Sequence, residues 1–97
     1  MARFDLYRDG ENFLLDVQAD TLFQLNTRAV VPVRLPNAAP LPARRLNPVF
    51  EIAGRRYVMV TQFISAVSES AVRHKDGNLT DHRDEITAAL DFLFQGF

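Results

Sequence analysis

The chain contains no cysteine and no tryptophan among its 97 residues. Without cysteine there is no disulfide framework and no thiolate chemistry, which fits the reducing cytoplasm that we expect for this protein. No apolar run is long enough to span a bilayer, and the first residues lack the apolar segment of a signal peptide. We therefore expect a cytoplasmic protein without a membrane partner.

A surplus of charge of either sign is also missing. Eleven basic and twelve acidic residues give a formal net charge of −1 and an isoelectric point of about 6.0. Nucleic-acid binding depends mainly on neutralising phosphates, so this balance argues against direct contact with DNA or RNA. Of the two basic pairs, Arg55-Arg56 is expected in a solvated turn. Arg44-Arg45 is either solvated as well or faces an acidic partner.

No motif for binding a cofactor or nucleotide, or for a hydrolytic triad, occurs in the sequence. The only histidines, His74 and His82, lie in polar surroundings without a second ligand at a metal-binding spacing. The run His82-Arg83-Asp84-Glu85 could supply acid and base groups, but consecutive residues of a helix face different directions, so a solvated helix start is expected. We therefore expect no enzyme activity, no metal and no cofactor.

Most of the sequence has the pattern of β-strands. Alternating or valine-rich apolar residues predict strands over 4–7, 13–18, 28–35, 47–52, 57–61 and 63–72. A turn is expected at residues 8–10 and another around Ala53-Gly54. Because proline cannot donate to a ladder, the strand containing Pro32 should be an edge, bulged or broken there. Residues 36–42 and 73–78 are expected to be loops.

The last segment changes to a helical period. Its apolar residues recur at helical spacing, at Ile86, Ala89, Leu90, Leu93 and Phe97. Thr80 or Asp81 is the predicted N-cap, and Gly96 is the predicted stop. We therefore predict one domain over residues 1–97, of mainly β class, in which a barrel-like sheet of antiparallel strands is closed by a C-terminal α-helix.

Bulky apolar residues continue to the end of the chain, from Phe92 to Phe97. Chain ends are normally polar and frayed unless they dock onto the protein. Either Leu93 and Phe97 pack into the core, or part of this tail is an exposed tip that binds another protein. Both interpretations can be true at once, with one face of the helix packed into the core and the opposite face exposed. The apolar surplus predicts a homodimer.

In five segments, residues 15–20, 28–33, 46–49, 78–86 and 94–97, the sequence resembles the CcdB toxin family of type II toxin–antitoxin systems. Residues 15–20, Leu-Asp-Val-Gln-Ala-Asp, are similar to its Val-Asp-Val-Gln-Ser-Asp, and residues 28–33 to its Arg-Met-Val-Ile-Pro-Leu. Residues 46–49 resemble its Leu-Tyr-Pro-Val. Residues 78–86 resemble its Asp-Leu-Ser-His-Arg-Glu-Asn-Asp-Ile, and residues 94–97 its Phe-Trp-Gly-Ile. The similarity runs almost from end to end, in order and at matching spacing.

This resemblance implies an SH3-like barrel with a small side sheet and a C-terminal helix. It implies a homodimer that binds and poisons the DNA gyrase A subunit and is neutralised by a CcdA-type antitoxin. The implied gyrase contacts are Asp91, Gln95, Gly96 and Phe97 in the helix tip, together with Thr21 and Leu22. For the antitoxin we expect Arg8, Asp9 and Glu11 in the first hairpin turn, and the pair Arg44-Arg45.

The sequence departs from the family pattern in two places, the end of the chain and the first hairpin turn, and these departures leave the function open. Gln95 replaces a tryptophan that stacks on an arginine of gyrase, and Phe97 replaces an isoleucine. The first hairpin turn is also shorter. One alternative is a degenerate toxin that keeps antitoxin binding without gyrase poisoning. Another is an endoribonuclease of the Kid/MazF type, which would need an acid–base set and a basic RNA path.

Overall fold

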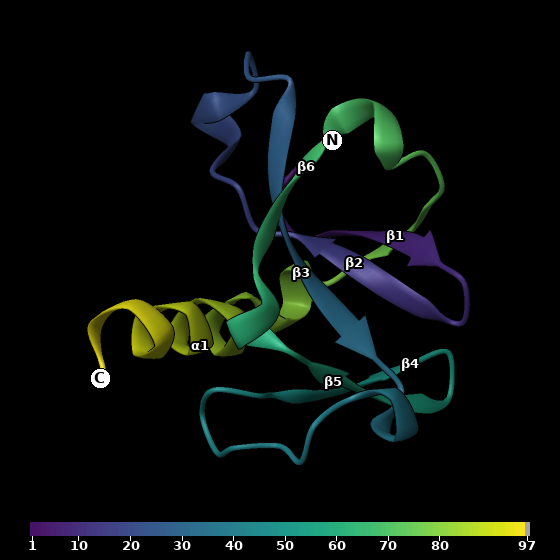
Figure 1. The fold of residues 1–97 in the computed structure, drawn as a ribbon, viewed down its shortest axis with the longest axis vertical. Helices are drawn as coiled ribbons and strands as arrows, with labels where there is room; N and C mark the ends of the chain where they lie inside the picture. Colours follow the sequence, from purple (N-terminus) through teal and green to yellow (C-terminus); the bar gives the residue numbers. More distant parts are fainter. Residues whose placement is uncertain (97) are drawn as a thin grey trace.

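The structure is a computed structural model that describes residues 1–96 of the chain; Phe97 lies outside the described residues. Short 3-10 turns connect the strands, and a helix follows them (Figure 1). The strands are β1 (Asp5–Asp9), β2 (Asn12–Asp16), β3 (Thr27–Arg34), β4 (Val49–Ile52), β5 (Arg55–Met59), β6 (Ser65–Ser68) and β7 (Lys75–Asn78). The turns are η1 (Asp20–Leu22), η2 (Pro36–Ala38), η3 (Thr61–Phe63), η4 (Glu69–Ala71) and η5 (Thr80–His82), and the helix is α1 (Arg83–Gln95).

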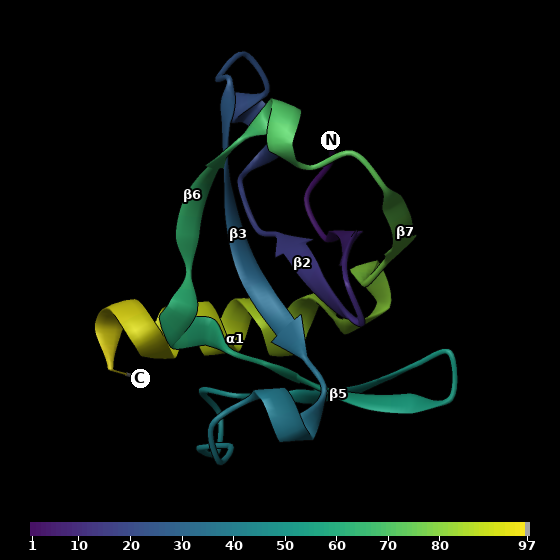
Figure 2. The same ribbon diagram turned by 45° about the vertical axis from the view of Figure 1, so that its right-hand side comes forward.

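The strands form one antiparallel sheet in the order β4-β5-β3-β2-β1-β7, from which β6 branches by pairing with β3. The sheet curls, and α1 crosses its open side (Figures 1 and 2). The predicted mainly-β class, with a barrel-like antiparallel sheet and a C-terminal helix, is confirmed. Strand β6 is the extra strand beside the barrel, and it remains hydrogen-bonded to the first half of β3.

The core lies between the concave face of the sheet and α1. From the helix, Ile86, Ala89 and Leu90 are buried, as their spacing predicted. The sheet contributes Leu6, Phe13, Leu15, Val31, Val33, Phe50, Tyr57 and Met59. Full burial of one large apolar side chain is worth about 1.5–3 kcal/mol, so these residues dominate the stability of the domain. Among residues 1–96, no helix is long and apolar enough to cross a membrane.

Pro32 lies inside the sheet, not at an edge or a break. Strand β3 pairs with β2 through this position, with Leu14 opposite Pro32. On the other side of β3, the partner changes from β6 at residues 27–30 to β5 at residues 33–34. The Pro32 carbonyl accepts a bond from Val60 N at 2.9 Å. Proline lacks the N–H that a ladder needs, and Pro32 lies where β3 changes partner from β6 to β5. The predicted break in the strand therefore occurs on this side of β3 only, and pairing with β2 continues.

The first hairpin turns later than expected. Asp9 pairs with Asn12, so the two-residue turn is Gly10-Glu11, and Gly10 has a φ of 63°. Arg8 and Asp9 therefore belong to β1, and the predicted turn at residues 8–10 was wrong. The alternating apolar residues predicted the strand β2, but they do not show at which residues the chain turns between β1 and β2. The second hairpin, around Ala53-Gly54, is confirmed.

Two expectations about the region before α1 were also wrong. Residues 73–78 were expected to form a loop, but Lys75–Asn78 forms β7, an exposed edge strand paired with β1. Its polar sequence carries no strand pattern, because neither face is buried. Neither Thr80 nor Asp81 caps α1 with its side chain. Instead Asn78 Oδ1 accepts a bond from Thr80 N at 2.7 Å and starts the turn that leads into the helix.

Candidate functional site

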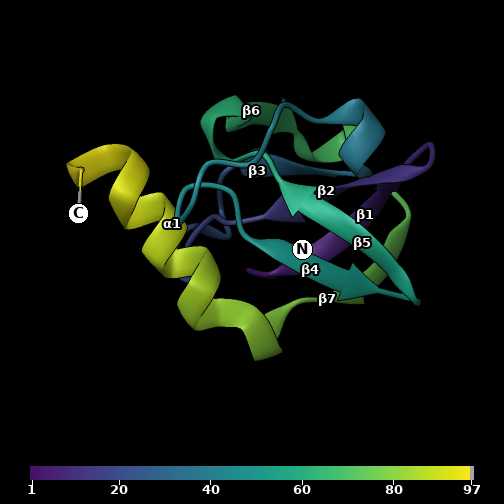
Figure 3. The same ribbon diagram turned by 90° about the horizontal axis from the view of Figure 1, so that it is seen from below.

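The C-terminal end of α1 is exposed beyond the last buried residue of the helix. The buried residues of α1 end at Leu90, and Phe92 and Leu93 are half-buried. Beyond them the side chain of Phe94 is 69% exposed. Figures 1 and 3 show the last turns of α1 extending past the body of the sheet. The helix end thus presents an apolar side chain that the core of this chain does not cover.

The residues predicted for gyrase binding lie on this exposed end. Asp91 and Gln95 are exposed and stand one turn apart, which places them on the same side of the helix. Gly96 ends the helix with a φ of 79°, and its N–H donates to the Phe92 carbonyl at 2.9 Å. The predicted helix stop is confirmed, whereas Phe97 lies outside the described residues. Asp91, Gln95 and Gly96 therefore form one surface, which we call the helix tip.

Thr21 and Leu22, the other two predicted target contacts, lie in η1 and are exposed. They do not meet the helix tip within one chain, since η1 and the end of α1 lie at separate corners of the molecule (Figure 1). The sequence analysis missed that Phe23 and Leu25 are exposed beside Leu22. Three large apolar residues between Asp20 and Asn26 were the available signal.

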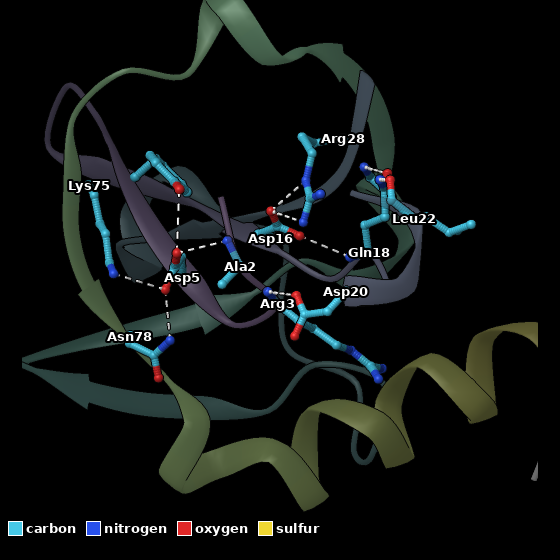
Figure 4. A network of polar contacts seen from close by, with 12 residues as sticks. Ala2, Arg3, Asp5, Asp16, Gln18, Asp20, Leu22, Arg28, Lys75 and Asn78 are labelled. Atoms are coloured by element: carbon cyan, nitrogen blue, oxygen red, sulfur yellow. Dashed lines mark hydrogen bonds and ion pairs between the residues drawn. The ribbon is translucent and has the colours of Figure 1, made fainter. Parts of the chain in front are cut away.

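A buried polar network holds η1 in place (Figure 4). Gln18 Nε2 donates to the Leu22 carbonyl at 3.1 Å, and Gln18 Oε1 accepts from Ala29 N at 3.1 Å. At the other side of the turn, Asp20 Oδ1 accepts from Arg3 N at 2.8 Å. The side chain of Gln18 is buried. These bonds fix the backbone that carries the exposed Leu22.

Asp16 and Arg28 form an ion pair at the centre of this network, and their side chains are 0% and 2% exposed. Arg28 Nε donates to Asp16 Oδ2 at 2.8 Å. Arg28 Nη2 lies 2.7 Å from the same oxygen without hydrogen-bond alignment. Burial raises the pKa of Asp16, while the Gln18 N–H and Arg28 oppose this rise. A pair so enclosed fixes strand β2 against β3 rather than serving an external ligand.

A second carboxylate, Asp5, ties β1 to its neighbours. It accepts bonds from Ala2 N at 2.9 Å and from Asn78 Nδ2 at 2.8 Å, and Lys75 Nζ lies 3.3 Å away. Burial alone would raise the pKa of Asp5, but these partners together lower it. Beside it, burial and the nearby carboxylates raise the pKa of Tyr7 to about 12. Asp5 therefore joins β1 to β7 and to the N-terminal residues, and the Tyr7 hydroxyl donates to Asp5 within β1.

The residues predicted for antitoxin binding lie in two separate places. Arg8 Nε donates to Asp76 Oδ2 at 3.0 Å, and the Arg8 guanidinium lies 4.6 Å from the Phe13 ring centroid. Asp9 and Glu11 are exposed beside it at the first hairpin turn. Arg44 and Arg45 are exposed in the loop before β4. The guanidinium of Arg45 lies over α1, 4.8 Å from the Phe92 ring centroid.

The two histidines do not form a metal site. His82 packs against Phe50, with 4.7 Å between ring centroids, and its Nδ1 lies 3.3 Å from Glu85 Oε1. No group of three potential ligands for a metal ion occurs within residues 1–96. The exposed residues of the helix tip and of η1 are the candidate functional surfaces of the chain.

Comparison with known proteins agrees with the resemblance in the sequence. No curated protein matches this chain. The model of the CcdB protein family matches residues 3–96, a range that includes the whole sheet, η1 and the helix tip up to Gly96. Members of this family are toxins of toxin–antitoxin systems and not enzymes. Because the match covers nearly the whole chain, the protein belongs to the CcdB family.

Proposed function

We propose that this protein is a homodimeric toxin that binds the DNA gyrase A subunit through its helix tip and is neutralised by a CcdA-type antitoxin. The observation that carries the proposal is the exposed end of α1, where Phe94, Gln95 and Gly96 project beyond the sheet. Family membership supports the same class of partners.

The helix tip has the physical properties of a preformed binding element. Ile86, Ala89 and Leu90 anchor the helix, so its end is held without using the exposed residues. The bond from Gly96 N to the Phe92 carbonyl closes the last turn. A rigid element loses less conformational entropy on binding than a flexible tail does.

Two exposed aromatic side chains, at and beside the end of α1, support the proposed homodimer. Phe94 is 69% exposed and Phe63, in the turn that packs against α1, is 46% exposed. Apolar side chains of this size are commonly covered by a partner. A two-fold dimer would present two helix tips and two copies of η1 to one target.

A cleavage-complex assay with purified protein and gyrase tests this function. We expect the wild-type chain to trap cleaved DNA, and we expect a chain that lacks Gly96 and Phe97 to trap none while keeping its circular dichroism spectrum. The matched control is Glu51→Gln, an exposed position on β4 away from the tip. If the shortened chain and the control trap DNA equally well, the helix tip is not the contact surface.

The replacement of the family's tryptophan by Gln95 favours a second candidate, a degenerate toxin that keeps antitoxin binding without gyrase poisoning. Glutamine covers less surface than tryptophan and cannot make the same cation–π contact. In that case the wild-type chain traps no DNA but still binds an antitoxin peptide. The endoribonuclease alternative is not supported, because the family does not consist of enzymes.

A further inference from the structure

The loop before β4 contains a hydrogen-bonded turn over residues 43–47, with Arg45 at its centre. Asn47 N donates to the Ala43 carbonyl at 2.9 Å, and Ala43 N donates to Asn47 Oδ1 at 3.0 Å. Asn47 is buried, and its Nδ2 also donates to the Met59 carbonyl at 3.0 Å and to Gln62 Oε1 at 2.8 Å. The turn is therefore bonded to itself and to the end of β5, and its backbone has a fixed shape.

Arg45 has an unusual backbone conformation within this turn. Its φ is 68°, in the left-handed region that residues with a side chain rarely adopt. Such a conformation persists only where the surrounding structure fixes it, and it is often found where a side chain has a particular task. Here the fixed turn directs the Arg45 guanidinium over the ring of Phe92, 4.8 Å from its centroid.

Phe92 accepts the hydrogen bond that ends the helix. Its carbonyl accepts the capping bond from Gly96 N, at 2.9 Å. Beyond the buried Leu90, the half-buried Phe92 and Leu93 are the last residues before the exposed end. One turn earlier, a cavity lined by Arg45, Pro48, Glu85 and Ala88 separates the loop from the helix. The Arg45–Phe92 contact joins this loop to the last turn of α1 beyond the cavity.

We infer that Arg45 is a positioning residue for the helix tip: by stacking on Phe92, it holds the last turn of α1 in the orientation that the target binds. The inference rests on the proposed function, because it assigns Arg45 a part in target binding. It also replaces the expectation that Arg45 faces the antitoxin. Arg44, the neighbouring arginine, is exposed and is expected to have no part in this.

The test is the affinity of the gyrase A breakage–reunion domain for the full chain and its variants. A cation–π contact at an exposed site changes an equilibrium constant by roughly two- to fivefold. We expect Arg45→Gln to weaken binding by about this factor, Arg45→Lys to weaken it less, and Arg44→Gln, which removes the same charge, to leave it unchanged. In a Phe92→Leu background, Arg45→Gln should have no further effect, since the ring is gone.

A second measurement needs no target. We expect the amide of Gly96 to exchange with solvent about two to five times faster in Arg45→Gln than in wild type or Arg44→Gln. If the wild-type chain does not bind gyrase but this exchange changes as expected, the proposed function fails while the positioning role stands. If the wild-type chain binds and Arg45→Gln behaves like Arg44→Gln in both measurements, the positioning role is refuted.

Discussion

Replacing Arg28 by methionine should destabilise the domain strongly, because it leaves the carboxylate of Asp16 buried without its counter-charge. Both side chains are at most 2% exposed, so water cannot take the place of the missing partner. At an effective dielectric constant of about 20, two charges about 4 Å apart interact by about 4 kcal/mol. Measured losses on breaking buried pairs are about 3–5 kcal/mol, and we expect a loss in that range.

The double variant Asp16→Asn/Arg28→Met distinguishes a lost interaction from an unpaired buried charge. It removes both charges, while the amide oxygen of the introduced asparagine can still accept the bond that Gln18 N now gives to Asp16 Oδ1 at 3.0 Å. We expect the double variant to recover most of the lost stability, because a buried pair replaced by groups of similar volume is often close to neutral. Each single variant should be less stable than the double variant.

Urea unfolding followed by circular dichroism, at one fixed protein concentration, measures these differences. The matched control is Asp76→Asn, which breaks the exposed pair with Arg8; the Arg8 and Asp76 side chains are 44% and 49% exposed. An exposed pair contributes about 0–1 kcal/mol, so this control should unfold nearly like wild type. A loss below about 1 kcal/mol for Arg28→Met would refute the reasoning, as would a double variant as unstable as the sum of the single variants.

Three further predictions concern pH, the second hairpin and assembly. The raised pKa of Tyr7, about 12, means that the folded state keeps a proton that the unfolded chain loses near pH 10. The unfolding free energy should therefore fall by up to about 3 kcal/mol as the pH rises from about 10 to about 12, and Tyr7→Phe should remove this loss. Ala53 has a φ of 52° in a turn with Gly54, where asparagine is preferred, so Ala53→Asn should raise the unfolding free energy in urea by about 1 kcal/mol. Light scattering at micromolar concentration should give the mass of a dimer, and Phe94→Ser should shift it toward the monomer.

The sequence predicted the parts of the fold that depend on apolar spacing. Phe13, Leu15 and Val17 alternate and face the core, and Ile86, Ala89 and Leu90 recur with the period of the helix. These patterns reflect which face of an element is buried, and burial supplies most of the stability.

Other parts depended on contacts between distant residues. The alternation of apolar residues over β2 does not reveal that Asp16 is buried, because its partner Arg28 comes from β3. Strand β7 has no apolar pattern because it pairs with β1 at an exposed edge. For the candidate site, the exposure of Gln95 and Gly96 followed from the helical period, whereas the Arg45–Phe92 contact required the shape of a loop.

The affinity of the gyrase A breakage–reunion domain for wild type and for Gln95→Trp tests the central claim most directly. An aromatic interface anchor is often worth about 2–4 kcal/mol, which corresponds to roughly a tenfold to thousandfold change in affinity. Gln95 is exposed at the tip, so the substitution should leave folding intact. We expect Gln95→Trp to bind more tightly than wild type; unchanged affinity would show that the helix tip is not the surface that contacts gyrase.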